Sequence, residues 1–493
     1  MEDITLIMGS VFPVPAVKGG AVENLIENIA KAQEKEKKVN LNIICAYDFN
    51  AEKIAKEKFK NTNFNHIKVG KINKFIDQCI SFVATKIFHK KNVMAYSYIF
   101  QRLGYYRKIS SLLHKKDFGK IILENSTGLY LALKWKKNYL KYEGRYYYHC
   151  HNKVNMDFSV NINPLGIPHS VKEAMSDALS YADRYPDMAC SGLKKAISEY
   201  FTQQGCSIQS EDVIPGNGAS ELFMAIAHAI KPKKAVLPAP GFFGYEHVLR
   251  AVGCDIGYFL LDEQSDFSPA ARLDALMDML TDDTDIFFIA NPNNPTGYLA
   301  DSTFMKQIIG HCKEKHIYVV ADECFMDFCE KNYSVLPLLC DYDNLIVVRA
   351  FTKLFAIPGV RLGYMLSKNE AVRQKVQRNL PEWNVSVLAQ MAGEACIMES
   401  EYIKETASYV SGQRRLLSDG LKKLGFKVYK SDADFILFYS KLPLYDILLN
   451  KGILIRDCSN YVGLSEGYFR VAVKTFNENV RLLKVIGECI EKN

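Results

Sequence analysis

Several features of secreted and membrane proteins are missing from this chain of 493 residues. Its 13 cysteines are an odd number and include no Cys-x-x-Cys pair, which favours reduced thiols over a disulfide framework. No run of 18 apolar residues occurs, and the first dozen residues lack the basic start of a signal peptide. We therefore expect a cytoplasmic protein that has no membrane span and binds no metal.

Charge is distributed unevenly along the chain. Residues 1–155 contain 27 Lys and Arg against 13 Asp and Glu, a net charge of +14, whereas the whole chain carries +7. Such asymmetry indicates two parts of different origin. The lysines of the first part are scattered and no aromatic-basic motif accompanies them, so we expect a solvated surface and no nucleic-acid partner.

The most informative segment is RAFTKLFAIPGVRLGY, residues 349–364. Lys353 follows the hydroxyl residue Thr352 and stands eight positions before Arg361. This pattern suits a pyridoxal phosphate site, in which the lysine amine forms a Schiff base while a hydroxyl and a guanidinium hold the phosphate. A surface lysine is the alternative interpretation of the segment taken alone.

Two strand-like runs end on polar residues. DIFFIA leads into NPNNPTG at residues 291–297, and IYVVA leads into Asp322. Because ligands bind at the carboxyl ends of strands in a parallel α/β sheet, Asn294 and Asp322 are expected to face one crevice. A carboxylate there favours the protonated pyridine nitrogen, and an amide suits the ring phenolate oxygen. An ordinary turn and a helix N-cap are the structural alternatives.

Two further segments complete a predicted cofactor cradle. In VIPGNGASELFMAIAHAI, a glycine-rich turn opens a helix, so the amides near Gly218, Ala219 and Ser220 would point at a phosphate. In LPAPGFFGYEHVL, Phe242 is placed to stack on a flat ring. The alternative interpretation is that Phe242 is an ordinary core residue, since the chain has 28 phenylalanines and most phenylalanines lie in a protein core.

The ordered segments GNGASE, PGFFGY, NPNNPTG, ADE, TK, GVRLGY and FRVAVK resemble the fold-type I aminotransferases, within them the histidinol-phosphate aminotransferase branch, over about residues 156–493. The resemblance implies a large seven-stranded α/β domain at about 185–380. It also implies a small α/β domain from about 156–184 and 381–493, pyridoxal 5'-phosphate as cofactor, and a homodimer.

The resemblance also implies a role for each matching residue. Lys353 is the Schiff-base lysine, Asp322 the pyridinium partner and Asn294 the partner of the ring oxygen. Phe242 is the stacking ring, and Arg470 in GYFRVAVK binds the substrate α-carboxylate. The implied phosphate ligands are Ala219, Ser220, Thr352 and Arg361, with Tyr185 of DRYPD reaching the phosphate of the other subunit.

One position departs from the histidinol-phosphate aminotransferase pattern. Those enzymes place a tyrosine three residues after the aspartate, where this chain has Phe325, so Asn294 is expected to be the main donor to the ring oxygen. With DFSVNINPLGIP (157–168) and the late run 453–474, this resembles the threonine-phosphate decarboxylases. A phosphorylated amino acid needs a second anion site, for which Arg456 is a candidate, and Asn163 would lie near the substrate.

Residues 1–152 show a different pattern. Strand-like runs (ITLIMGS, LNIICAYD, KIILEN, YYYHCHN) alternate with helical stretches, a Rossmann-like order without GxGxxG. VFPVPAVKGGAVENLIENIAK and HCHN resemble the N-terminal half of a GT-B glycosyltransferase of the family 4 type. Since the sugar-nucleotide half does not follow, we expect a residual binding or scaffolding domain fused at about residue 153.

Three functions follow from these observations. The leading one is pyridoxal-phosphate-dependent decarboxylation of L-threonine O-3-phosphate to (R)-1-amino-2-propanol O-2-phosphate, a step of cobamide formation. The second is an aminotransferase of the histidinol-phosphate type. The third is a non-catalytic, glycosyltransferase-like binding protein, which the complete set of Lys353, Asp322, Asn294 and Arg361 disfavours. Decarboxylation and transamination differ in which bond stands perpendicular to the cofactor ring, and sequence does not report that torsion.

Overall fold

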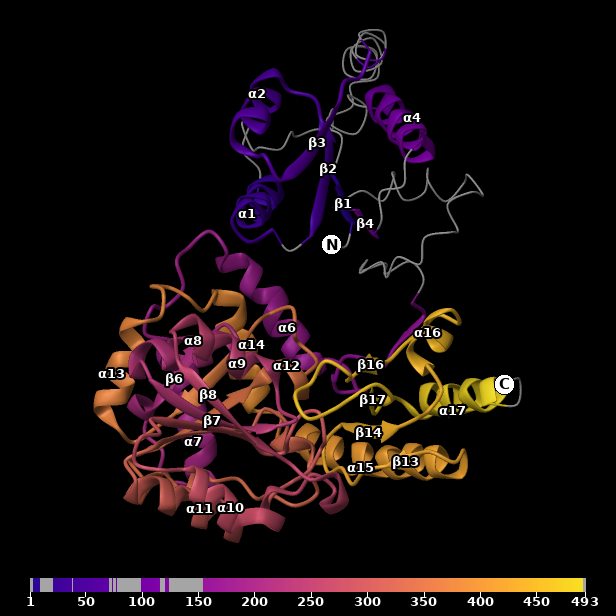
Figure 1. Ribbon diagram of the computed structural model, residues 1–493. Helices are drawn as coiled ribbons and strands as arrows, with labels where there is room; N and C mark the ends of the chain where they lie inside the picture. Colours follow the sequence, from indigo (N-terminus) through magenta and orange to yellow (C-terminus); the bar gives the residue numbers. More distant parts are fainter. Residues whose placement is uncertain are drawn as a thin grey trace. The chain divides into compact units, whose positions relative to one another are not determined.

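The computed structural model divides the chain into two compact units, Met1–His149 and Cys150–Asn493. The residues whose structure is described are 3–8, 21–37, 39–70, 73, 77, 99–115, 120–123 and 154–490. Each unit has its own sheets and hydrophobic cores, and Figure 1 labels helices and strands of both units. The predicted boundaries at residues 152 and 156 and the division into a large and a small domain stay predictions.

The first unit contains a parallel sheet in the order β3-β2-β1-β4. Every residue of β2 after its first is buried, as expected for an inner strand of a parallel sheet covered on both faces. Asp48 accepts hydrogen bonds from the amides of residues 50 and 51 and so begins α2. The described elements are β1 (Asp3–Ile7), α1 (Ala21–Glu36), β2 (Asn40–Ala46), α2 (Phe49–Lys58), β3 (Thr62–Ile67), α4 (Ile99–Lys115) and β4 (Lys120–Leu123).

The alternation of strands and helices agrees with the α/β pattern expected here. Residues 11–20 and 149–152, which carry much of the glycosyltransferase resemblance, lie outside the described residues.

The second unit is built on a sheet of seven strands in the order β6-β12-β11-β10-β9-β7-β8. All pairs are parallel except those of β12, which is antiparallel to both of its neighbours. The predicted seven-stranded sheet is therefore confirmed. Its strands are β6 (Val213–Gly216), β7 (Lys234–Ala239), β8 (Asp255–Leu260), β9 (Ile286–Ala290), β10 (Tyr318–Asp322), β11 (Leu345–Ala350) and β12 (Gly363–Leu366).

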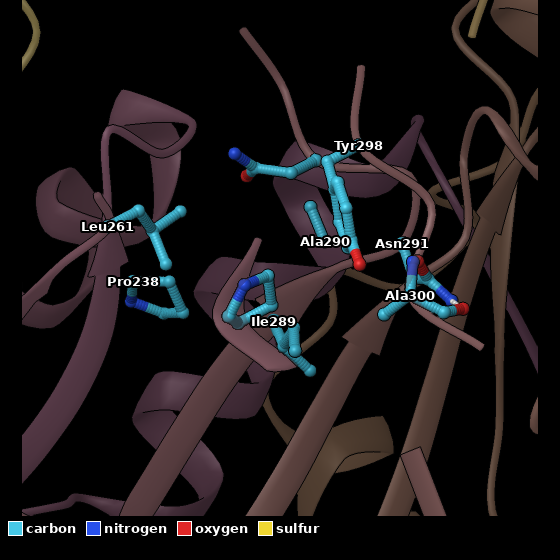
Figure 2. Close-up of a pocket in the computed structure, with 9 residues that line it drawn as sticks. Pro238, Leu261, Ile289, Ala290, Asn291, Tyr298 and Ala300 are labelled. Atoms are coloured by element: carbon cyan, nitrogen blue, oxygen red, sulfur yellow. Dashed lines mark hydrogen bonds between the residues drawn. The ribbon is translucent and has the colours of Figure 1, made fainter. Parts of the chain in front are cut away.

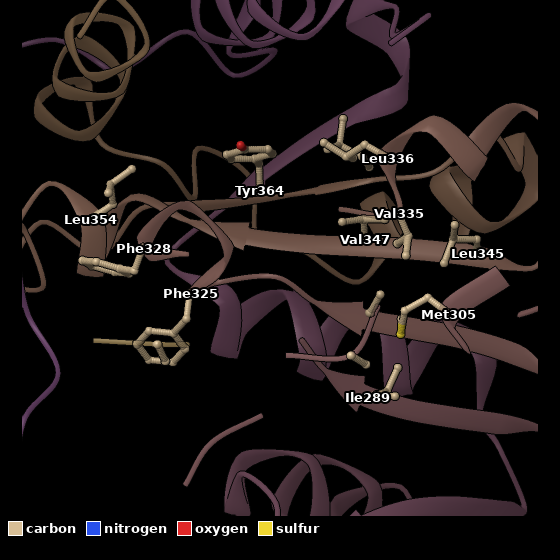
Figure 3. Packing of buried hydrophobic residues seen from close by; sticks show 14 of the residues in the cluster. Ile289, Met305, Phe325, Phe328, Val335, Leu336, Leu345, Val347, Leu354 and Tyr364 are labelled. Carbon is tan, nitrogen blue, oxygen red and sulfur yellow. The ribbon is translucent and has the colours of Figure 1, made fainter. Parts of the chain in front are cut away.

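Alternate residues of the inner strands enter two hydrophobic cores on opposite faces of this sheet. In β9, Phe287 and Ile289 join one core and Ile286 and Phe288 join the other, as the two-residue period of a strand requires. Figure 3 shows the first core, where Ile289 lies with residues of β11 and Phe325. The helices around the sheet are α6 (His169–Ala178), α7 (Ser191–Gln203), α8 (Ala219–Ile230), α9 (Phe243–Ala251), α10 (Leu273–Met279), α11 (Ser302–Glu314), α12 (Phe351–Leu354), α13 (Glu370–Arg378) and α14 (Val387–Ile397).

A second, antiparallel sheet has the order β13-β14-β17-β16. The start of the unit joins this end of the chain, because β5 pairs with β15 and Phe158 packs in the core of the second sheet. The remaining elements are β5 (Met156–Asp157), α15 (Ser400–Lys423), β13 (Lys427–Val428), β14 (Phe435–Tyr439), α16 (Leu444–Leu449), β15 (Ile453–Leu454), β16 (Arg456–Asp457), β17 (Tyr468–Ala472) and α17 (Phe476–Ile490).

Short 3-10 helices connect several of these elements: η4 (Leu179–Tyr181), η5 (Ser210–Asp212), η6 (Glu263–Ser265), η7 (Pro269–Arg272), η8 (Met326–Phe328) and η9 (Leu336–Cys340). Among the helices of the described ranges, none is long and apolar enough to cross a bilayer.

Candidate active site

Three of the predicted residues lie at the carboxyl ends of adjacent strands. Asp322 ends β10, Asn294 lies in the turn that follows β9, and Lys353 lies in α12 directly after β11. Since β9, β10 and β11 are neighbours and parallel, these side chains meet at one edge of the sheet. The structure thus brings together the residues that the strand ends predicted.

Asp322 is buried and well supplied with hydrogen-bond donors. Its Oδ2 accepts a hydrogen bond of 2.5 Å from the Tyr245 hydroxyl, and its Oδ1 accepts one of 3.0 Å from the Cys324 amide. Burial raises the pKa of Asp322, while these contacts and the charge of Lys353 act in the opposite direction. The carboxylate is therefore held in place before any ligand binds.

Tyr245 was not anticipated from the sequence. It lies on α9, is buried, and its ring centroid is 5.4 Å from that of Phe242. The available signal was its spacing, because Tyr245 follows three residues after Phe242, the residue that caps α9. Phe242 itself is half-buried and caps the start of α9, and its role as the stacking ring stays a prediction.

Lys353 lies in an apolar and partly cationic environment. Burial lowers the pKa of its amine, and the charges of Arg470 and Arg361 lower it further. Attraction by Asp434 is the strongest effect in the opposite direction. A lowered pKa makes the unprotonated, nucleophilic amine more available.

Asn163 supports the Lys353 segment. Its backbone amide donates to the Lys353 carbonyl over 3.1 Å. Its side-chain Nδ2 donates to the Leu354 carbonyl over 2.7 Å and to the Thr406 hydroxyl over 2.8 Å. The side chain is thus engaged within the protein, and its assignment as a substrate ligand stays a prediction.

The amino end of α8 lies beside Arg361. Helix α8 begins at Ala219, and a Cβ added to Gly218 would stand 2.8 Å from Arg361 Nη2. Gly218 has a φ of +76°, which also favours glycine. Backbone amides at a helix start and a guanidinium both bind phosphate, so the structure brings together groups that were predicted as phosphate ligands. Ser220 lies in the first turn of α8, and Thr352 is buried next to Lys353.

Arg470 links β17 to the turn that follows β9 and to the segment after β5. Its Nη1 donates to Asn294 Oδ1 over 2.5 Å and its Nη2 donates to the Ser159 carbonyl over 2.7 Å. The guanidinium also lies over the Phe435 ring, 5.2 Å from its centroid. Because Arg470 occupies the amide oxygen, the Asn294 nitrogen is left to donate to a ligand.

Arg456 lies directly opposite Arg470 in the antiparallel pair of β16 and β17. Residues directly opposite each other point to the same face, and like charges there are destabilising unless an anion lies between them. Arg456 Nη2 donates to Asn460 Oδ1 over 3.0 Å and its guanidinium lies 5.2 Å from the Tyr461 ring centroid. The register therefore places these two arginines opposite each other on the same face of the sheet.

Phe325 and Tyr185 lie in contrasting surroundings. Phe325 is buried and meets the Phe435 ring edge to face, with centroids 5.1 Å apart, so no phenol is present at this position. Tyr185 is 81% exposed and its ring centroid is 4.9 Å from that of Trp383. Its predicted contact with the phosphate of a second subunit stays a prediction.

A small hollow lies beside the turn that follows β9 (Figure 2). Its lining is mainly apolar and includes Pro238, Leu261, Ile289, Tyr298 and Ala300. None of the predicted cofactor or substrate residues lines it. The hollow is therefore separate from the strand-end site.

The residues at the strand ends fit pyridoxal phosphate. Its phosphate group would be held by the start of α8 with Arg361, and its ring nitrogen by the buried Asp322. Lys353 would supply the amine that binds its aldehyde, in an environment that lowers the amine pKa. The buried Nε of Arg470 has no hydrogen-bond partner in the described part of the chain.

Comparison with known proteins identifies the family. Residues 153–486 match the family described as Aminotransferase class I and II. The chain is 34% identical over 335 residues to the threonine-phosphate decarboxylase of Salmonella typhimurium, an alignment covering 67% of this chain and 90% of that protein. It is 31% identical over 341 residues to the histidinol-phosphate aminotransferase of Methanothermobacter thermautotrophicus, with 67% and 88% covered.

A solved structure agrees with this match. The crystal structure of the histidinol-phosphate aminotransferase from Clostridium acetobutylicum aligns with a TM-score of 0.63 and 29% identity, covering 69% of this chain and 100% of that one. The family match begins at residue 153, so the glycosyltransferase resemblance of residues 1–152 stays a prediction. The chain belongs to the class I and II aminotransferases, a family of pyridoxal-phosphate-dependent enzymes.

Proposed function

We propose that the enzyme decarboxylates L-threonine O-3-phosphate, releasing CO₂ and (R)-1-amino-2-propanol O-2-phosphate. The observation that carries this proposal is the cross-strand pair of Arg456 and Arg470. The substrate has a carboxylate and a phosphate, one anionic group for each guanidinium. Similarity to a threonine-phosphate decarboxylase over 90% of that protein's length supports it as well.

The proposed roles follow from the contacts of each residue. Arg470 binds the α-carboxylate and Arg456 the substrate phosphate. Asp322 keeps the cofactor ring nitrogen protonated, and Asn294 donates to the ring oxygen. Bound pyridoxal phosphate supplies the electron sink for the pair left at Cα when CO₂ departs. Lys353 then delivers a proton to Cα, so the product has gained one hydrogen where the carboxylate was lost.

The remaining assignments concern the cofactor itself. Phe242 stacks on the ring, and Ala219, Ser220, Thr352 and Arg361 hold the cofactor phosphate. Asn163 lies against the Lys353 turn and faces the substrate from there.

A second copy of the chain completes the proposed assembly. Several large apolar side chains before α7, together with Trp383, are exposed in the single chain, and a partner subunit would cover them. These are Leu179, Tyr181, Tyr185, Met188 and Trp383. In such a homodimer Tyr185 reaches the phosphate of the partner's cofactor.

Transamination of histidinol phosphate is the second candidate function. It is favoured by the similarity to histidinol-phosphate aminotransferases at 31% and 29% identity. Histidinol phosphate has a phosphate but no α-carboxylate, so it would leave one of the two paired arginines without an anion. Residues 1–152 serve as a binding or scaffolding domain in either case.

Carbon dioxide release separates the two functions. We expect sustained release of CO₂ from L-threonine phosphate without any keto acid, because a decarboxylase regenerates its cofactor in each turnover. A transaminase would stop after one turnover until 2-oxoglutarate was added. Turnover that requires 2-oxoglutarate, with histidinol phosphate as amine donor, would replace the first proposal with the second.

A further inference from the structure

A buried carboxylate beside Lys353 has no part in the roles assigned above. Asp434, the residue before β14, is fully buried. Neither of its carboxylate oxygens has a hydrogen-bond partner within the described ranges. Burying such a group without a partner is costly, so its presence at a site calls for a function.

The backbone around Asp434 is fixed to both parts of the site. The Asp432 amide donates to the Gly297 carbonyl over 2.8 Å, which ties this segment to the turn that contains Asn294. The Asp434 carbonyl accepts a hydrogen bond of 2.7 Å from the Val473 amide, just after the strand of Arg470. The carboxylate is therefore positioned by the two segments that also position Asn294 and Arg470.

Titratable groups from several elements act electrostatically on Asp434. Burial raises its pKa to about 7, and Lys353 is the group that lowers it most, followed by Arg470 and Lys474. Arg414 and the Cys329 thiol also interact with its charge. Among the effects that raise the pKa of Lys353, attraction by Asp434 is the largest.

We propose that Asp434 is a positioning residue that stabilises the proton on the Lys353 nitrogen. The inference rests on the proposed assignment of Lys353 as the cofactor lysine. A protonated nitrogen withdraws electrons from the carbon bonded to it and so promotes attack by the substrate amine. Burial, Arg470 and Arg361 all disfavour that proton, and Asp434 opposes them.

The test is a pH titration of the visible absorption band of the full-length holoenzyme without substrate. Asp434→Asn removes the negative charge, so we expect the midpoint of the titration to fall by about one pH unit. Asp434→Ser is the second neutral variant and is expected to shift the midpoint in the same direction. Asp434→Glu restores the charge and should bring the midpoint back toward wild type.

Asp432→Asn is the matched control. Asp432 lies two residues away and is not among the largest influences on Lys353, so this variant should titrate much like wild type. An unchanged midpoint in both neutral variants would overturn the proposal. Loss of cofactor from both would overturn it too, because Asp434 would then be needed to build the site.

The titration is independent of the reaction catalysed. If Asp434→Asn shifts the midpoint but the wild type releases no CO₂, the proposed decarboxylation is disproved and the proposed role of Asp434 still holds. If borohydride reduction attached the cofactor to a lysine other than Lys353, the assignment of Lys353 on which both proposals rest would be wrong.

Discussion

Two buried carboxylates of the second unit differ in their hydrogen bonds. Asp322, at the end of a strand of the seven-stranded sheet, accepts hydrogen bonds from the Tyr245 hydroxyl and the Cys324 amide. Asp434, at the start of a strand of the second sheet, accepts none from the described residues. We call Asp322, Asn294 and Lys353 the strand-end group. Asp434, Arg456 and Arg470 are called the small-sheet group.

The two groups differ in how many of their buried polar atoms have hydrogen-bond partners within the described part of the chain. Asp322 is held by two donors, while Asp434 and Arg470 Nε have buried atoms without partners in the described structure. A hydrogen-bonded carboxylate is held in place, whereas a buried polar group without a partner carries the cost of its desolvation. The expected effects of substitution differ accordingly.

The largest effect is expected at Lys353. Lys353→Ala should abolish the covalent link to the cofactor and with it the visible absorption band, because the substitution removes the amine that forms the link. Borohydride reduction and peptide mapping of the wild type should recover the cofactor on Lys353. Lys368→Ala is the control, since Lys368 pairs with Asp212. Recovery of the label elsewhere would disprove the assignment.

The second largest effect is expected for substitution of Asp322. Asp322→Asn nearly keeps the shape and removes the charge, so we expect kcat to fall on the order of 10²-fold or more with cofactor still bound. Tyr245→Phe keeps the charge and should cost about tenfold at most. Since the Tyr245 hydrogen bond lowers the pKa of Asp322, its loss should move the acid limb of the kcat profile to higher pH. Activity of Asp322→Asn within about twofold of wild type would refute its role.

Substitution of Arg456 tests whether the small-sheet group binds the substrate phosphate. Arg456→Gln should raise KM for L-threonine phosphate by about tenfold or more while changing kcat less, because the phosphate lies away from the bond that breaks. Binding of the cofactor should stay as in wild type. Arg415→Gln, at a surface pair with Glu330, is the control. Equal KM values for Arg456→Gln and wild type would place the substrate phosphate elsewhere.

The smallest effect concerns stability without cofactor. Because the pKa of Asp434 is raised to about 7, its contribution to stability is fully present below its unfolded pKa of 3.8 and is lost as pH rises through about 7. Each pH unit in that window costs up to about 1.4 kcal/mol. Asp434→Asn should therefore raise Tm relative to wild type more at pH 8 than at pH 5.5. A Tm difference independent of pH would show that Asp434 has an ordinary pKa.

Much of the strand-end group was predictable because its residues follow recognisable strands. Asn294, Asp322 and Lys353 come directly after apolar runs, and parallel strands bring such positions together. Tyr245 was missed because its spacing of three residues from Phe242 was the only signal. Asp434 was missed because nothing in SDADFILF distinguishes a buried carboxylate from a turn residue at the start of a strand.

By itself the sequence indicated the strands that lead to Asn294 and Asp322 and the Lys353 segment, since these depend on local patterns of apolar, glycine and hydroxyl residues, while its resemblance to the fold-type I aminotransferases implied the seven-stranded sheet. Only the tertiary structure decided that Arg456 stands opposite Arg470, that Arg470 orients the Asn294 amide and that Asp434 is buried beside Lys353. Register and burial depend on contacts between residues far apart in the chain, and local sequence does not specify those contacts.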